Sequence, residues 1–152
     1  MAFILHNGAE ISFDRVFVPQ LDWRRPKWPK PIKRLRRLLP TYLTNAGPSR
    51  LSEKGNWFVI AYSSSTPVGY AWTIRSLKDG DAYVEEVAVQ PQFRRQGLGG
   101  KLVVETAAWV YQSGFRSISL LPIGSDTWVK RLGMEKTDLG YDAAISDLLG
   151  YQ

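Results

Sequence analysis

The stretch that decides the fold is YVEEVAVQPQFRRQGLGGK, residues 83–101. Its first seven residues alternate between two sets of side chains, which predicts a strand that ends before Pro91. The alternation places Tyr83, Glu85, Val87 and Val89 on one face and Val84, Glu86 and Ala88 on the other. A glycine-rich turn follows, and apolar residues recur after it at helical spacing, so we expect a helix over residues 97–113 that Gly114 stops.

A glycine-rich turn that opens a helix predicts a phosphate site. The first N–H groups of a helix have no partner inside it, and the helix dipole places partial positive charge at that end. Gly97 and Gly99 carry no Cβ, so the backbone can come close to an anion, and Arg94 and Arg95 add charge that pairs with phosphates. Leu102 excludes the Walker pattern, which needs Ser or Thr there, and the dinucleotide fingerprint, which needs a third glycine there.

The rest of the chain predicts a mixed sheet. Further strands are expected at residues 11–18, 57–62, 69–75 and 117–121. An apolar period from Ile32 to Leu39 predicts a helix that Pro40 kinks or ends. A short helix with Trp128 and Leu132 on its buried face is expected later. Strands first, then strand–helix–strand–helix, indicate a sheet with a helix packed across it.

Residues 85–99 resemble the signature of the GNAT acetyltransferases, in which a strand and a Pro turn lead to Gln/Arg-x-x-Gly-x-Gly/Ala at a helix start. Residues 128–134, WVKRLGM, are similar to the family's Phe-Tyr-x-x-x-Gly-Phe ending. The resemblance covers roughly residues 56–137. It implies an α/β (α+β) fold of GNAT type, with a mixed, mostly antiparallel sheet flanked by helices. We expect a single domain over residues 1–152, in which residues 21–40 form a variable basic segment.

The resemblance also implies acetyl-CoA as the cofactor. Residues 95–100 would supply backbone N–H groups to the pyrophosphate, and the main chain of Val87 and Val89 would bond to the pantetheine arm and the acetyl carbonyl. The predicted cofactor-binding residues are Val87, Ala88, Val89, Arg94, Arg95, Gln96, Gly97, Leu98, Gly99, Gly100 and Lys101.

Acyl transfer to an amine requires a base, because an ammonium group has a pKa near 10 in water. Glu85 shares its predicted face with Val87 and Val89, so it is the candidate base, directly or through a water molecule. Glu86 is the second choice. The alternative for Glu85 is a solvated or salt-bridged carboxylate without a catalytic role.

The tyrosine that is the usual acid of the family is replaced here by Val129, which cannot donate a proton. The thiolate would leave unassisted, take a proton from water, or use a hydroxyl such as that of Tyr141, Tyr111 or Ser125. The chain has no cysteine and one histidine, which excludes a thiol acyl-enzyme and argues against a metal site. We therefore expect direct attack by a primary amine and no metal.

The basic charge of the chain is concentrated in one segment. Eight basic residues and no acidic one lie between Arg24 and Arg37; without them, 12 basic residues face 14 acidic ones. The segment is interpreted either as a solvated basic face, with Trp23 and Trp28 tucked against the core, or as a surface for an acidic substrate or protein partner. Nucleic acid is the least favoured partner.

The acceptor is expected to be a small-molecule, peptide or protein amine. Two other functions stay open: a non-catalytic domain that binds or senses acyl-CoA, and a nucleic-acid-associated protein that docks through the basic segment. No apolar run approaches the roughly 20 residues that span a bilayer. We expect a cytoplasmic protein without a membrane span, and a homodimer is left open.

Overall fold

The computed structural model describes residues 3–22, 24–38, 54–122 and 125–150, and its centre is an eight-stranded sheet in the order β1-β2-β3-β4-β5-β6-β8-β7. The strands are β1 (Phe3–Ile4), β2 (Glu10–Val18), β3 (Asn56–Ser63), β4 (Thr66–Arg75), β5 (Asp81–Val89), β6 (Ser117–Leu120), β7 (Glu135–Thr137) and β8 (Gly140–Ala144). Within these residues β5 and β6 form the one parallel pair, and the other neighbours are antiparallel. The expected mixed, mostly antiparallel sheet is confirmed.

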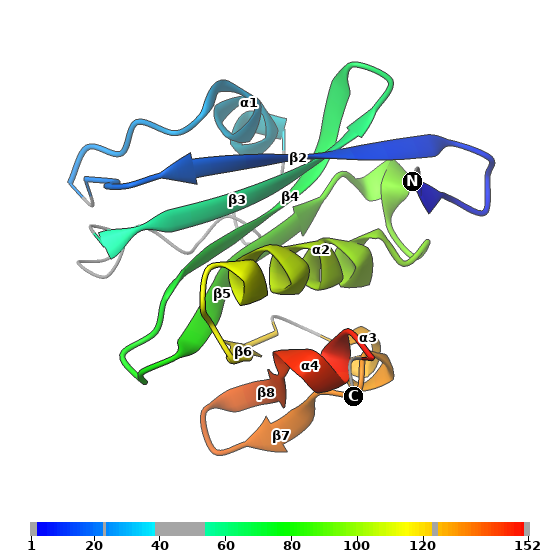
Figure 1. Cartoon of the computed structure of the whole chain (residues 1–152). Coiled ribbons are helices and arrows are strands. Elements are labelled where there is room, and N and C mark those ends of the chain that lie inside the picture. The colour runs from blue at the N-terminus through cyan, green and yellow to red at the C-terminus, as the bar shows by residue number, and fades with distance from the viewer. Residues whose placement is uncertain (1–2, 23, 39–53, 123–124, 151–152) are drawn as a thin grey trace.

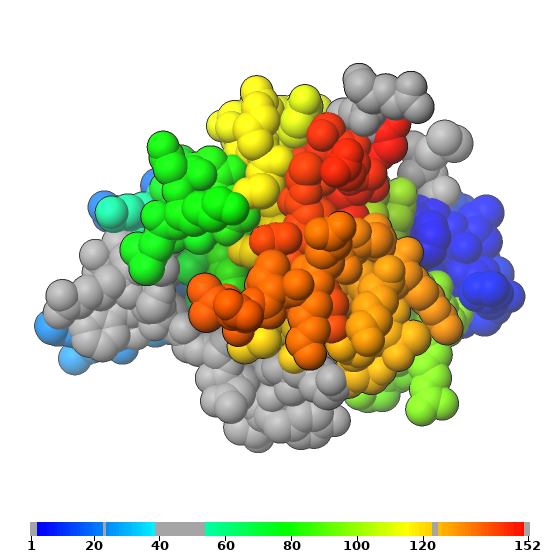
Figure 2. Space-filling view, turned by 90° about the horizontal axis from the view of Figure 1, so that it is seen from below, coloured from blue at the N-terminus to red at the C-terminus, as the bar shows by residue number. Residues whose placement is uncertain are grey.

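Helices flank this sheet, with α1 and α2 on opposite faces (Figure 1). They are α1 (Lys30–Leu38), α2 (Leu98–Gln112), α3 (Thr127–Arg131) and α4 (Ile145–Leu148), and a 3₁₀ turn covers Pro91–Phe93. The elements of the C-terminal part gather on one face beside α2, as the orange and red atoms of Figure 2 show. The expected α+β class with helices on the sheet is therefore correct.

Both faces of the central strands are buried, and this is why residues 57–61 of β3 and 67–74 of β4 are apolar almost without interruption. On the α1 face, Ile32 and Leu35 of the helix pack with Phe58, Tyr70 and Trp72. On the α2 face, a larger set of aliphatic side chains fills the core, including Val84, Leu102, Val103, Ala107 and Ile118. Helix α1 is described as far as Leu38; Leu39 and the expected kink or end of the helix at Pro40 lie outside the described residues.

The predicted alternation along β5 is wrong in one respect, because the strand contains a β-bulge. Trp72 pairs with Glu86 and Thr73 pairs with Val84, so Glu85 is an extra residue with no partner on β4. The bulge shifts the phase of the strand. Tyr83 packs on the α1 face, whereas Val87 packs on the α2 face, so these two residues do not share a face as the sequence suggested.

The sheet is closed at one end of β5 and open at the other. The parallel ladder between β5 and β6 runs from Asp81 opposite Ser117 to Val84 opposite Leu120 and ends there. At the closed end, the hydroxyls of Ser117 and Ser119 each donate a hydrogen bond of 2.7 Å to the buried carboxylate of Asp81. Beyond Val84, β5 continues to Val89, and its residues 86–89 pair with β4 alone among the described strands.

We expect Asp81→Ala to lower the free energy of unfolding by about 3 kcal/mol, because two hydrogen bonds to a buried carboxylate are lost and two hydroxyls lose their acceptor. Urea denaturation measures this. The control is Asp79→Ala, which removes an exposed carboxylate from the preceding turn and should change stability by less than about 0.5 kcal/mol. Equal effects of the two substitutions would show that the hydrogen bonds between Asp81 and the two serines do not hold β6 in place.

Candidate active site

The turn between β5 and α2 presents a set of backbone N–H groups without helical acceptors. Gly97 precedes the helix in the left-handed region, with φ of 81°, and the helix has no side-chain cap. Its first hydrogen bond runs from the N–H of Lys101 to the carbonyl of Gly97, at 3.0 Å. The N–H groups of residues 98, 99 and 100 therefore point ahead of the helix, where its dipole is positive.

The glycines of this turn differ in what they do. A Cβ at Gly100 would meet the side chain of Leu132 at 3.4 Å, an ordinary van der Waals contact with the end of α3. A Cβ at Gly99 would meet only Val87, at 3.8 Å, and one at Gly97 would meet nothing within 4 Å. The packing of the fold does not require glycine at position 99. The open space there suits the close approach of an anion to the backbone.

Arg94 supplies a partly buried positive charge beside these amides. Its Nε donates a 2.9 Å hydrogen bond to the carbonyl of Val89, which fixes the side chain along the end of β5. Its Nη2 is buried and has no hydrogen-bond partner. A buried unsatisfied donor is uncommon in folded proteins and calls for an explanation. A phosphate oxygen would be a fitting acceptor, since arginine pairs well with phosphates.

The remaining predicted residues of the turn surround the N–H groups at the start of α2. Arg95 is exposed and has φ of 61°, a conformation that non-glycine residues rarely adopt. The Oε1 of Gln96 is buried without a partner, while its Nε2 donates to the carbonyl of Gln92 at 3.4 Å. Lys101 pairs sideways with Glu105 at 3.1 Å. Arg95 and Lys101 therefore flank the amides, and Leu98 is buried beneath them.

The main chain of β5 faces the open end of the sheet at alternate residues. Gln90 donates its N–H to Val68, so the opposed residues Val89 and Gly69 form a pair without mutual hydrogen bonds. By the same alternation, the N–H and C=O groups of Val89 and Val87 point away from β4, and those of Ala88 point toward it. The Val89 carbonyl meets Arg94 on that side. Beside Val87, two polar main-chain groups face the edge where β6 has ended.

Two carboxylates lie at the bulge. Glu86 is buried on the α1 face: the hydroxyl of Tyr70 and Nη1 of Arg36 both donate to its Oε1, the latter at 2.7 Å, and Oε2 has no partner. Burial raises the pKa of Glu86, and the hydrogen bond from Tyr70 and the charge of Arg36 oppose that rise. Burial and the adjoining negative charge of Glu86 raise the pKa of Tyr70, which therefore keeps its proton.

Glu85 is half-buried at the bulge, and no cation pairs with it in the described part of the chain. Burial raises the pKa of Glu85, and the charge of Glu86 raises it further. The charge of Glu85 in turn helps to raise the pKa of Tyr83, after burial. Glu85 is thus coupled electrostatically to Tyr83 and Glu86, and because of the bulge Tyr83 and Val87, which were expected to share a face with it, lie on opposite faces of the sheet.

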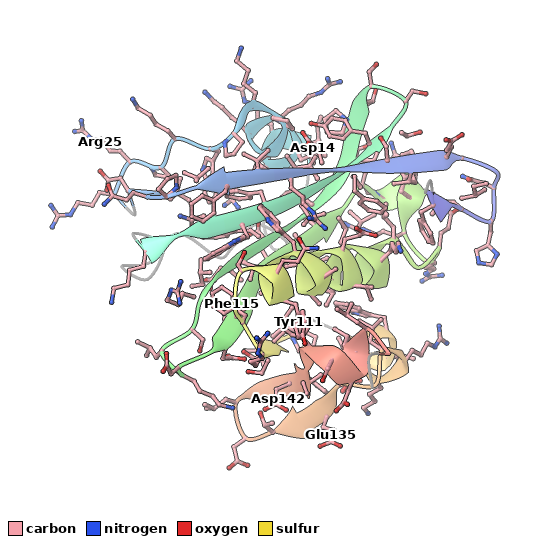
Figure 3. The ribbon with its side chains drawn as sticks, in the orientation of Figure 1. Asp14, Arg25, Tyr111, Phe115, Glu135 and Asp142 are labelled. Carbon is pink, nitrogen blue, oxygen red and sulfur yellow. The ribbon has the colours of Figure 1, made fainter. Side chains whose placement is uncertain are left out.

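The place of Arg36 beside the acidic pair was not predicted, since its segment was interpreted as a solvated basic face or as a surface for an acidic partner. Its side chain is 17% exposed, and its guanidinium lies 4.2 Å from the centre of the Trp28 ring. A signal was present, because Arg36 follows Ile32 by four residues and so falls on the buried side of α1. Arg25, before the helix, projects outward as expected (Figure 3).

The candidates for a general acid lie near α3. Val129 is fully buried in the core on the α2 face, so a tyrosine there would need space that neighbouring side chains fill. The hydroxyl of Tyr141 donates to Asp126, and this bond and partial burial raise the pKa of Tyr141. The Ser125 hydroxyl meets Thr127 at 3.0 Å, and Arg116 lies over the ring of Tyr111 at 4.7 Å. Tyr141 is the buried one of the three proposed hydroxyls.

None of the helices described is both long enough and apolar enough to cross a membrane.

Solved structures with this fold are numerous. The chain superposes on an assigned acyl-CoA N-acyltransferase from Klebsiella pneumoniae with a TM-score of 0.62 and 16% identity, over 88% of this chain and 97% of that one. A GNAT family acetyltransferase from Brucella melitensis, in complex with acetyl-CoA, gives 0.58 and 17%, over 86% and 88%. An aminoglycoside acetyltransferase from an uncultured soil metagenomic sample, in complex with sisomicin, gives 0.52 and 17%, over 81% and 84%.

Sequence comparison gives the family. A search of curated proteins found no match. The family model of the acetyltransferase (GNAT) family matches residues 17–129, which include the bulged strand, the glycine turn and α2. Because the match covers most of the chain, the protein belongs to the acetyltransferase (GNAT) family.

Proposed function

We propose that the protein is an N-acetyltransferase that moves an acetyl group from acetyl-CoA to a primary amine by direct attack. Membership of the family supports acetyl transfer in general. The observation that carries the proposal for this chain is the row of free donors from β5 to α2. It comprises the outward main chain of Val87, the unpartnered Nη2 of Arg94 and the three N–H groups at the start of α2.

These donors fit a coenzyme that is anionic at one end and amide-bearing along its arm. The N–H groups of Leu98, Gly99 and Gly100, with Arg94, would hold the pyrophosphate, and Arg95, Gln96 and Lys101 would flank it. The main chain of Val87 and Val89 would align the pantetheine arm along the open edge of β5, with Ala88 buried behind it. Acetyl-CoA would supply an activated thioester there. The relative from Brucella melitensis is in complex with acetyl-CoA.

Glu85 would take the proton of the amine, directly or through a water molecule. It lies at the bulge, next to the open edge of β5 that the main chain of Val87 faces. Its raised pKa makes it a stronger base than an ordinary glutamate. Glu86 is less suited to this task, because Arg36 and Tyr70 already occupy one of its oxygens. The leaving thiolate needs little help, since a thiol has a pKa near 8.5, and water or Tyr141 would supply its proton.

The acceptor stays a class: an amine on a small molecule, a peptide or a protein. One relative is an aminoglycoside acetyltransferase, and this makes a polyamine-like small molecule a reasonable first compound to assay. The specific observation that favours a second function is Val129, which leaves the site without the usual tyrosine. A domain that only binds acyl-CoA would release no thiol above the buffer rate with any amine, whereas amine-dependent thiol release by the wild type excludes it.

For the coenzyme, we expect Gly99→Leu to abolish the rise in melting temperature that coenzyme A gives the wild type by mass action. The new side chain would occupy the space into which the backbone amides point, while the fold has room for its Cβ. Stability without ligand should be unchanged or slightly higher, because leucine favours helix over glycine. Ser113→Leu, at the exposed far end of α2, is the control and should keep the shift. A full coenzyme shift in Gly99→Leu would place the coenzyme elsewhere.

For the base, we expect Glu85→Gln to lower turnover roughly ten- to a thousand-fold with coenzyme affinity nearly unchanged. In the wild type, kcat/KM should fall as pH drops through the raised pKa of Glu85, because the protonated carboxyl cannot accept a proton. The loss caused by the substitution should shrink at high pH, where the amine is already neutral. An equal loss at every pH would instead indicate that Glu85 positions the substrate.

The same substitution carries its own control for folding. A carboxyl whose pKa is raised by folding costs stability once it ionises, and that cost is present at neutral pH and disappears at low pH. Removing the charge should therefore increase the free energy of unfolding at pH 7. A less active but more stable Glu85→Gln protein cannot owe its lower activity to unfolding.

A further inference from the structure

Arg36 differs from its basic neighbours on α1. Lys33, Arg34 and Arg37 are exposed, but Arg36 turns toward the sheet and reaches Glu86 of β5. Its Nη1 lies 2.7 Å from Oε1 of Glu86 and 3.4 Å from the hydroxyl of Tyr70. Its guanidinium also stacks against Trp28. Partners on β4, on β5 and in the segment before α1 hold this one cation in place.

Glu86 depends on that cation. Its side chain is 3% exposed, and an isolated charge in such a place is costly. Among the described residues, the groups that face it are Tyr70 from β4, Arg36 from α1, and Glu85 beside it on β5, and Arg36 is the one of these that brings positive charge. Tyr70 donates a hydrogen bond but stays neutral, and Glu85 adds negative charge. The hydrogen bond from Tyr70 and the charge of Arg36 thus both favour the ionised form of Glu86, and Arg36 is the one of the two that carries positive charge.

The ionised form matters because Glu85 is adjacent. Two coupled carboxyls bind protons as a pair, so the proton that the amine gives up can go to either of them. We propose that Arg36 is a positioning residue that keeps Glu86 charged and hydrogen-bonded and leaves Glu85 as the carboxylate that accepts the proton of the amine. This inference rests on the proposed acetyl transfer. It assigns α1 a role in the chemistry, because this helix carries the cation that stabilises the charge of Glu86 beside Glu85.

The test compares Arg36→Met, which removes the charge but keeps an apolar stem, with Arg36→Lys, which keeps the charge. The control is Arg37→Met, the same change at the next, exposed position. Carbon NMR of protein labelled at the glutamate carboxyls follows each titration, with the signals of Glu85 and Glu86 assigned from their glutamine variants. In Arg36→Met the titration midpoint of Glu86 should rise by about 1–3 pH units. The rise should be smaller in Arg36→Lys and absent in Arg37→Met.

Steady-state kinetics supply the second readout. Arg36→Met should lower kcat/KM for the amine by roughly tenfold or more, because part of the contribution of the base is lost, with KM for acetyl-CoA unchanged. Arg36→Lys should recover part of this loss. If Arg36→Met does not fold, Arg36→Gln serves as the uncharged variant. An unchanged midpoint of Glu86, or an unchanged kcat/KM in an uncharged variant, would overturn the inference. The titration needs no turnover, so an inactive wild type that shows the shift would contradict the proposed acetyl transfer alone.

Discussion

One extra residue in β5 determines how the rest of the site is built. Because Glu85 has no partner on β4, the strand changes phase between Val84 and Glu86. The parallel ladder to β6 stops at the same level. Past the bulge, β5 is bound on one side only, and the main chain of Val87 faces an edge that no described strand covers. The bulge also places Tyr83 on the α1 face and Val87 on the α2 face. A regular strand would have kept both on one face of the sheet.

The turn after β5 carries features that a purely structural turn would not need. A tight strand-to-helix connection requires glycine where φ is positive, as at Gly97. It does not require glycine at position 99, nor a buried arginine nitrogen without an acceptor. Both are explained together if an anion binds at the start of α2, because the anion fills the space above Gly99 and accepts from Arg94. Stability has been given up at a place where a ligand can restore it.

The sequence predicted local features well, because local features follow from periodicity and from glycine and proline. Helix α2, its opening turn and the paired strands β3 and β4 are within a few residues of their expected bounds. The bulge could not be predicted, since the apolar and polar residues of β5 alternate on paper without a break and only the pairing with β4 reveals the extra residue. The buried place of Val129 depends on contacts between α3 and the core. Arg36 was misassigned because its charge outweighed its helical spacing from Ile32.

The central claim is that a pyrophosphate-bearing coenzyme binds at the start of α2 and along the open edge of β5. Calorimetric titration of the wild-type protein with coenzyme A and, separately, with pantetheine tests it most directly, because the two share the arm and differ in the pyrophosphate and nucleotide. The account predicts that coenzyme A binds measurably, that raising the salt concentration weakens it, and that pantetheine binds at least about tenfold more weakly, since roughly 1.4 kcal/mol of charge-assisted bonding is the least that such a site should supply. Equal affinities for the two compounds, or no binding of coenzyme A at millimolar concentration, would contradict it.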